Sequence, residues 1–324
     1  MEEIILRTGE TLKDVSCNKI WVKGKNVTIE NVTVEGDEEA LYSNYNCSGL
    51  VVRNSTFISH GKNAVHIIAD TLKDPIEGIR FKNCVFIGYR MGVELQNHKN
   101  EKPKIDGVEF ENCKFRGTDG RGYALSLTGY GRNVYILNCV FEGRVKGVEI
   151  AGFSDVTLQG CKIQGGKESL IASNDRLMRN ITARSCELKG KVYLENASES
   201  NLSWCKVEAL CVYLKNSTFI TLIGNDIRST GSYGVMMDQS RECLVTDNTI
   251  TQRGSNYSIV RCYGKNATGN IVRGNAISMK KPKKGKWYDQ TGKANVGFAK
   301  GNVFTDNKQQ YIKKDDGHNN DYHG

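Results

Sequence analysis

Apolar and polar residues alternate along almost the whole chain, in short runs that are separated by Asn, Gly or Asp. Between Val108 and Phe115, for example, Val108 and Phe110 fall on one side of an extended chain and the glutamates beside them on the other. The alternation slips by one residue at Asn112, after which Cys113 and Phe115 return to the apolar side. Because Asn, Gly and Asp tolerate a left-handed backbone, the slip predicts a tight bend between two strands.

This pattern recurs about twelve times, at intervals that average about 24 residues. A third strand follows a short loop in most repeats, as in the segments 92–96 and 147–151. Three short strands per repeat without a helical segment predict an all-β fold, a parallel β-helix solenoid of about 12 coils. Superimposing the repeats aligns one inward position directly after each bend: Val32, Ser55, Cys84, Cys113, Cys139, Cys161, Cys186, Cys205, Asn225, Asn248, Asn275 and Asn302.

In the later repeats an inward asparagine follows the bend, as in GND (224–226), DNT (247–249), GNA (274–276) and GNV (301–303). This motif resembles the repeat of the right-handed parallel β-helix, or pectin-lyase-like, superfamily, in which inward asparagines stack at one corner. The resemblance covers roughly residues 15 to 306 and implies a right-handed helix; six repeats depart from it by carrying Cys in place of Asn. Since the superfamily includes lyases, hydrolases, epimerases, phage tailspikes and inert spacers, the resemblance implies a fold rather than one activity.

The continuous repeat predicts one elongated domain, with residues 1–25 as an N-terminal closing segment, 26–306 as the β-helix and 307–324 as a polar C-terminal tail. The first residues lack an apolar run of signal-peptide length, and no stretch is apolar enough to span a membrane. We therefore expect a protein made in the cytoplasm and without a membrane partner. Because an open β-helix end exposes unpaired backbone, we expect the end to be capped, to form a homo-oligomer or to attach to a virion.

The net charge of +9 favours an acidic partner, most simply an acidic polysaccharide, with a solvated basic surface as the alternative. Basic residues are scattered along the repeats, which argues against nucleic acid. Eleven cysteines without a signal peptide predict reduced thiols, and the six aligned cysteines are expected to point inward as small apolar side chains. The chain has no Cys-x-x-Cys pair, so we predict neither a metal site nor a cofactor.

The third strands predict one row of outward-facing side chains, which we call the outer stripe: Tyr42, His66, Glu94, Ser126, Glu149, Ile171, Tyr193, Tyr213 and Met236. Its N-terminal half is the preferred candidate cleft, because the longest loops flank it and long loops on a rigid scaffold often carry function. These loops are at 69–77, 97–106, 117–123 and 173–180.

Two carboxylates on the outer stripe suggest acid and base chemistry. Glu94 and Glu149 lie two repeats apart, or roughly 9.6 Å at ~4.8 Å per strand. This is near the upper end of the separation of ~6.5–9.5 Å between the carboxyl groups of inverting glycosidases. We therefore predict them as catalytic residues, with His66 and Asp119 assisting; a solvated pair on an exposed strand is the alternative.

The candidate substrate-binding residues are Ser126, Arg121, Lys102, Tyr193 and Tyr213. The basic side chains would bind the carboxylates of uronic acids. The two tyrosines fall on adjacent repeats and would stack against sugar rings, although stacking of like residues also stabilises a β-helix.

Two functions follow from these observations. The first is a carbohydrate-active protein that binds an acidic polysaccharide and cleaves it as a tailspike-like glycoside hydrolase or polysaccharide lyase. The second is a non-catalytic structural or adhesive β-helix, such as a virion component. The residue sets typical of polygalacturonases and pectate lyases are missing, which disfavours those two activities.

Overall fold

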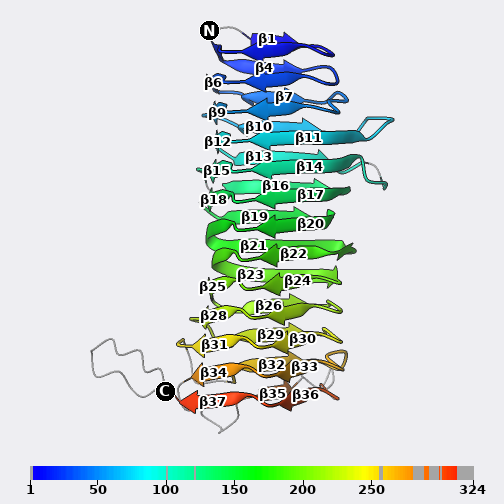
Figure 1. The fold of residues 1–324 in the computed structure, drawn as a ribbon. Coiled ribbons are helices and arrows are strands. Elements are labelled where there is room, and N and C mark those ends of the chain that lie inside the picture. The colour runs from blue at the N-terminus through cyan, green and yellow to red at the C-terminus, as the bar shows by residue number, and fades with distance from the viewer. Residues whose placement is uncertain are drawn as a thin grey trace, which may run out of the picture.

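The computed structural model describes residues 3–99, 101–119, 122–254, 258–279, 288–291, 299 and 301–311. In this part of the chain the regular elements are all β strands, which pair in parallel from one coil to the next. The coils stack along one axis from the N-terminal to the C-terminal strands (Figure 1). The protein is therefore a right-handed parallel β-helix, as the sequence predicted. No helix within the described ranges is long and apolar enough to cross a membrane.

Each coil contributes a strand to each of three sheets. Sheet 1 contains β2 (Thr11–Lys13), β5 (Thr28–Glu30), β8 (Val51–Arg53), β11 (Ile76–Lys82), β14 (Ile105–Glu111), β17 (Gly131–Leu137), β20 (Ser154–Gln159), β22 (Ile181–Arg184), β24 (Asn201–Ser203), β27 (Thr221–Ile223), β30 (Leu244–Thr246), β33 (Ile271–Arg273) and β36 (Val303–Thr305). Sheet 2 contains β3 (Ser16–Cys17), β6 (Thr33–Gly36), β9 (Thr56–Ser59), β12 (Val85–Gly88), β15 (Lys114–Gly117), β18 (Val140–Gly143), β25 (Lys206–Ala209), β28 (Asp226–Ser229), β31 (Thr249–Gln252), β34 (Ala276–Met279) and β37 (Lys308–Tyr311). Sheet 3 contains β1 (Glu3–Leu6), β4 (Lys19–Val22), β7 (Leu41–Ser43), β10 (Val65–Ile68), β13 (Met91–Asn97), β16 (Tyr123–Gly129), β19 (Lys146–Ala151), β26 (Val212–Lys215), β29 (Val235–Asp238), β32 (Val260–Tyr263) and β35 (Tyr288–Thr291). Two long strands, β21 (Lys162–Arg179) and β23 (Glu187–Ser198), run through both sheet 2 and sheet 3.

The bends between sheets 1 and 2 have the left-handed backbone that the slips in the pattern predicted. Asn83, Asn112 and Asn138 have φ angles of 54°, 53° and 53°, and Asp247 has 54°. A left-handed residue turns the chain sharply, so the next side chain points back into the core. The prediction of the bends is confirmed.

Aromatic side chains fill the core between the sheets in the first half of the molecule. Val108, Phe110 and Phe115, which were predicted to be inward, are at most 1% exposed. The rings of neighbouring coils stack, with centroids 5.0 Å apart for Phe81 and Phe110 and 4.4 Å apart for Phe115 and Phe141. This alignment follows from the parallel register, which places equivalent residues of successive coils directly above one another.

The residues directly after each bend form a continuous inward row, which we call the corner row. In the later coils its asparagines bond from coil to coil: Nδ2 of Asn225 donates to Oδ1 of Asn248, and Nδ2 of Asn248 to Oδ1 of Asn275, both at 2.9 Å. These side chains are at most 2% exposed, so the bonds satisfy amides that water does not reach. The members of the corner row are Val32, Ser55, Cys84, Cys113, Cys139, Cys161, Cys186, Cys205, Asn225, Asn248, Asn275 and Asn307.

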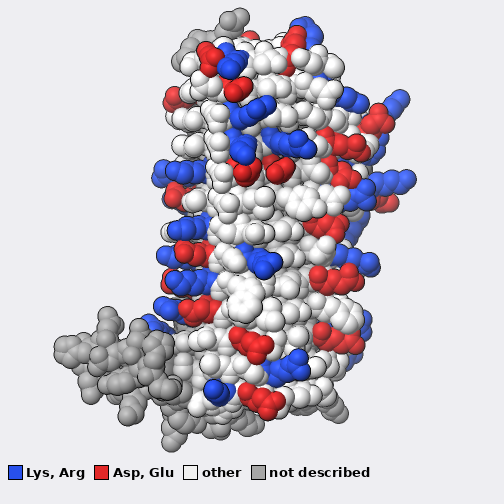
Figure 2. All heavy atoms as spheres, in the orientation of Figure 1, with Lys and Arg blue, Asp and Glu red and all other residues white. Residues whose placement is uncertain are grey.

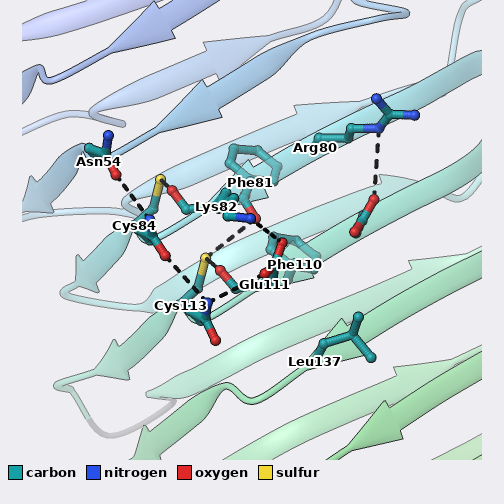
Figure 3. Close-up of polar contacts among 12 residues, drawn as sticks. Asn54, Arg80, Phe81, Lys82, Cys84, Phe110, Glu111, Cys113 and Leu137 are labelled. Atoms are coloured by element: carbon teal, nitrogen blue, oxygen red, sulfur yellow. Dashed lines mark hydrogen bonds and ion pairs between the residues drawn. The ribbon is translucent and has the colours of Figure 1, made fainter.

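The cysteines of the corner row occupy the same positions as the asparagines and make similar contacts. Sγ of Cys113 donates to the carbonyls of Glu111, at 3.3 Å, and of Phe81 in the preceding coil, at 3.6 Å (Figure 3). Sγ of Cys139 accepts from the backbone N–H of Cys113 at 3.4 Å. All six cysteines are buried and none forms a disulfide.

The last coil corrects the predicted alignment. Asn307, rather than Asn302, accepts a bond from Asn275 at 2.8 Å, whereas Asn302 accepts from Asn270 at the opposite end of the sheet 1 strand. The sequence was misread because this coil has two bends that are each followed by Asn, at Gly301 before sheet 1 and at Asp306 before sheet 2. Only the Asn after Asp306 belongs to the corner row.

The strands also extend beyond the predicted domain boundaries. Segment 1–25 contributes β1 to β4, and β1 and β2 pair with strands of the next coil. Sheet 1 consequently has 13 strands, one more than the repeats counted in the sequence. At the other end, β37 pairs with β34, so regular pairing continues five residues past the predicted end at 306.

Candidate functional site

The outer stripe runs along sheet 3 in one continuous register. His66 pairs with Tyr42 on one side and with Glu94 on the other, and the alignment continues coil by coil to Met236. On the face that Figure 2 shows, charged side chains of both signs alternate along the two edges, and much of the surface between them is uncharged. The parallel β-helix thus builds a long, straight row of side chains at strand spacing, ~4.8 Å apart.

Glu94 and Glu149 lie two coils apart with Ser126 between them, which is the register predicted from the sequence. Ser126 was expected to face solvent, but it is fully buried, because its short side chain lies between two longer ones on the adjacent strands. Its hydroxyl donates to Oε2 of Glu149 at 2.9 Å, and Nζ of Lys146 bonds to the other oxygen at 2.5 Å. Each carboxyl oxygen of Glu149 therefore has a hydrogen-bond donor beside it.

Glu94 belongs to a second group of partners, centred on His66. Its Oε2 accepts from Nδ2 of Asn63 at 2.7 Å and lies 3.3 Å from Nε2 of His66. Nδ1 of His66 lies 3.7 Å from Oε1 of Glu39 on the opposite side. The imidazole thus lies between two carboxylates, and the side chains of His66 and Glu94 are each only 14% exposed.

The pKa values of this group reflect its arrangement. Burial alone would lower the pKa of His66, but the nearby carboxylates of Glu39 and Glu94 outweigh burial and raise it. Burial would raise the pKa of Glu39, but His66, the backbone and Lys62 lower it to about 2. His66 is therefore protonated over a wider pH range than an isolated histidine.

Glu39 was not predicted from the sequence. It precedes β7 and lies outside the alternating pattern of the third strands, so only the register of the adjacent coil brings it to His66. Lys146, the first residue of β19, was also missed, because it lies just before the segment 147–151 that was predicted as the strand.

Farther along the stripe, Tyr193 and Tyr213 lie on adjacent coils, as predicted, with ring centroids 5.2 Å apart. Nζ of Lys191 lies 4.2 Å from the Tyr193 centroid, and the Tyr213 hydroxyl donates to Asp238 at 2.7 Å. Burial, followed by Glu195 for Tyr193 and by Asp238 for Tyr213, raises the pKa of both phenols. The tyrosines therefore present neutral rings at neutral pH.

The predicted loop residues lie at the two edges of sheet 3. Asp119 follows β15, in the connection that enters sheet 3, and its backbone N–H bonds to the Tyr89 carbonyl at 2.7 Å. Lys102 is exposed in the connection that leaves sheet 3. The structure does not bring these two residues together, and Arg121 lies outside the described residues.

Two solved structures of one enzyme support the fold, and a third structure is less similar. DFA-IIIase from Arthrobacter chlorophenolicus A6, as a variant in complex with DFA-III, is 13% identical and has a TM-score of 0.57, with 89% of this chain and 75% of that chain covered. The same enzyme in complex with GF2 is 12% identical, with a TM-score of 0.55 and coverage of 97% and 75%. The A-module of an Azotobacter vinelandii mannuronan C-5 epimerase is 11% identical, with a TM-score of 0.47 and coverage of 96% and 91%.

Comparisons of sequence give one family. No curated protein sequence matches the chain. A family model described as "Periplasmic copper-binding protein (NosD)" matches residues 131–324. That description implies copper, for which cysteine thiolates and histidines are typical ligands.

The described residues do not fit a copper ion. No group of three or more His, Cys, Asp or Glu side chains in this part of the chain is arranged to hold a metal. The aligned cysteines donate their thiol protons to backbone carbonyls, as Cys161 does to Ile136 and Gln159 at 3.4 Å. The neighbouring Cys139 thiol and burial raise the pKa of Cys113 to about 12, so the thiolate form of Cys113, which would bind a metal, is disfavoured.

The match to the family covers more than half of the chain, in coils that repeat the same bend and corner row as the unmatched N-terminal coils. The chain belongs to the NosD family.

Proposed function

We propose that the protein binds a chain of an acidic polysaccharide along the outer stripe. The observation that carries this proposal is a row of half-buried aromatic and ionisable side chains on one sheet, from Tyr42 to Tyr213, in which Ser126 and Ile171 are the buried members. Aromatic rings with a few fixed polar groups are typical of ligand sites. The net charge of +9 favours an acidic ligand, and the similar fold of DFA-IIIase, solved with DFA-III, agrees with a ligand on a β-helix.

The proposal extends from binding of the polysaccharide to its cleavage. Glu149, which accepts hydrogen bonds from Lys146 and Ser126, suits the base that takes a proton from the attacking water. Next to Glu94, the protonated His66 suits the group that gives a proton to the leaving oxygen, and Glu94 holds the imidazolium in place. Two strand spacings, roughly 9.6 Å, separate the backbones of Glu94 and Glu149, which leaves room for a water molecule and a glycosidic bond between them.

Binding is tested by titrating the protein with oligosaccharides of galacturonate, glucuronate and mannuronate in a calorimeter. Tyr213→Ala should weaken binding by about tenfold, since it removes one ring of the pair. The matched control is Tyr135→Ala, which removes an exposed ring from sheet 1. Absence of binding by the wild type would refute the proposal.

Cleavage is tested on the same oligosaccharides by assaying new reducing ends, together with the absorbance of an unsaturated uronic product. Glu94→Gln and Glu149→Gln should each reduce turnover by about 10²-fold or more while the Tm changes little. Glu109→Gln, on sheet 1, is the matched control. If the wild type binds but cleaves nothing, the stripe is a non-catalytic binding surface and the acid and base assignments are wrong.

A further inference from the structure

Beside the outer stripe, where the chain leaves sheet 3 for sheet 1, the surface contains a cavity of about 390 Å³. Its walls come from the ends of β16, β19 and β21 and from the loop after β13, so at least three coils contribute. Thr128 lies two residues beyond Ser126 on β16, which places the cavity next to the level of Ser126 and Glu149 on the stripe. The volume is at the low end of the range for ligand pockets, ~300–1,000 Å³.

Two hydroxyl groups in the wall of this cavity have no partner. Oγ1 of Thr128 and the phenolic oxygen of Tyr130 are buried, and neither forms a hydrogen bond with any described residue. Buried polar groups in proteins are almost always hydrogen-bonded, so an unpaired pair in one cavity wall points to a polar ligand or to water.

The cavity also contains a cation that no carboxylate neutralises. Arg176 lies with its guanidinium 4.6 Å from the centroid of the Tyr130 ring and forms no ion pair with the described residues. By contrast, Arg132 in the same wall is bonded to Asp106 at 2.7 Å. Asp155, the acidic residue of the wall, accepts a hydrogen bond from Asn180 at 3.0 Å. Arg176 thus remains available for one anionic group of a ligand.

We infer that this cavity binds a carboxylate-bearing sugar residue, a hexuronate, of the polysaccharide on the outer stripe. Arg176 donates to the carboxylate through its planar fork of N–H groups, which matches a carboxylate better than a single ammonium does. The hydroxyls of Thr128 and Tyr130 bond to hydroxyls of the sugar. The inference rests on the proposed function and adds to it the residue that recognises the acidic group.

The test compares each uronate oligosaccharide with its carboxyl-reduced, neutral counterpart in the same calorimetric titration. Arg176→Gln should weaken binding of the uronate form by about tenfold to a hundredfold, because it removes a charge-assisted hydrogen bond, and should leave binding of the neutral form unchanged. Arg179→Gln is the matched control, since Arg179 is an exposed arginine on the same strand and does not line the cavity.

A second pair of variants distinguishes binding from folding. Tyr130→Phe and Thr128→Val remove hydroxyls that have no hydrogen-bond partner among the described residues, so the Tm should stay the same or rise while uronate binding weakens. If Tyr213→Ala weakens binding but Arg176→Gln, Tyr130→Phe and Thr128→Val do not, the inference about the cavity is wrong and the stripe proposal stands. If the wild type binds neither form, both are wrong.

Discussion

Asn248 links three coils of the corner row, and replacing it gives a direct test of what holds the coils together. Its Nδ2 donates to the carbonyls of Leu222 and Thr246 and to Oδ1 of Asn275, each at 2.9 Å. Its Oδ1 accepts from both the backbone N–H and Nδ2 of Asn225, also at 2.9 Å. The side chain is 1% exposed, so water cannot replace these partners.

Asn248→Leu removes all of these bonds while keeping a side chain of similar size. It leaves the buried backbone N–H of Asn225 without its acceptor and the Leu222 carbonyl without the amide donor. Each unsatisfied buried group costs ~1–3 kcal/mol, so with these two groups the free energy of unfolding should fall by about 2–6 kcal/mol.

Asn248→Cys is the matched control, because six other coils already have a thiol at this position. Sγ of Cys205 donates to carbonyls of Ser203 and Ala183 at 3.4 Å and accepts from the N–H of Cys186 at 3.5 Å. A thiol at position 248 should therefore keep the main contacts, and the free energy of unfolding should fall by only about 1 kcal/mol.

The assay is urea unfolding under reducing conditions, followed by circular dichroism and by tryptophan fluorescence. If the transitions from the two probes coincide, the protein unfolds in one cooperative step and a single free energy describes it. The check is needed because the coils of a solenoid can also unfold separately. The reasoning fails if Asn248→Leu unfolds at the same urea concentration as the wild type. It also fails if Asn248→Cys is as destabilised as Asn248→Leu.

Four further predictions concern other parts of the molecule. In the folded protein a thiol reagent should label Cys211, which is partly exposed, before the buried cysteines of the corner row; rapid labelling of all of those would contradict their inward placement. Trp204→Asn should raise the free energy of unfolding by up to about 1 kcal/mol, because Trp204 is 61% exposed and has a φ of 56°, which Asn adopts more readily; a lower Tm would contradict this. The pKa of Glu39 is lowered from 4.5 to about 2, so the charged form of Glu39 adds about 3 kcal/mol to the free energy of unfolding. This stabilisation is present above pH 4.5 and is lost as the pH falls toward 2. Glu39→Gln should therefore flatten the acid side of a plot of Tm against pH, and an unchanged plot would refute the assignment. The pKa of His66 in the folded protein is raised above 6.5, so the stabilisation from its protonated form is fully present below pH 6.5 and is lost as the pH rises through that pKa. In His66→Gln the Tm should no longer fall over this pH range for that reason.

The fold was predictable because every coil repeats the same local requirements. A left-handed residue at the bend, an inward residue after it and alternation along each strand recur from Asn31 to Asp306, and each leaves a trace in the sequence. The alignment of the outer stripe follows from the same register, since a parallel sheet places equivalent residues of successive coils side by side.

The surroundings of the site were less predictable. Whether a side chain on the stripe is exposed depends on the length of its neighbours, which is why Ser126 and Ile171 are buried. Glu39 reaches the stripe from a position before β7, and Lys146 reaches it from the first position of β19; the alternating pattern of the predicted strands includes neither residue. The wall of the cavity near Arg176 combines residues from several coils, and segment 173–180, expected to be a loop, mostly belongs to β21.

The charges on sheets 1 and 3 differ in a way that fold stability does not explain. On sheet 1 the ion pair of Arg80 and Glu109 has side chains 69% and 41% exposed, which is ordinary for a solvated surface and contributes little. On sheet 3 the side chains of His66 and Glu94 are both 14% exposed, so desolvation opposes their charged forms. A neutral residue at these outward positions of sheet 3 would keep the alternation of inward and outward side chains equally well, as Tyr193 does. Charged groups kept half-buried in one row, with the pKa of His66 raised, are typical of functional sites, so sheet 3 rather than sheet 1 is the face on which to look for the ligand.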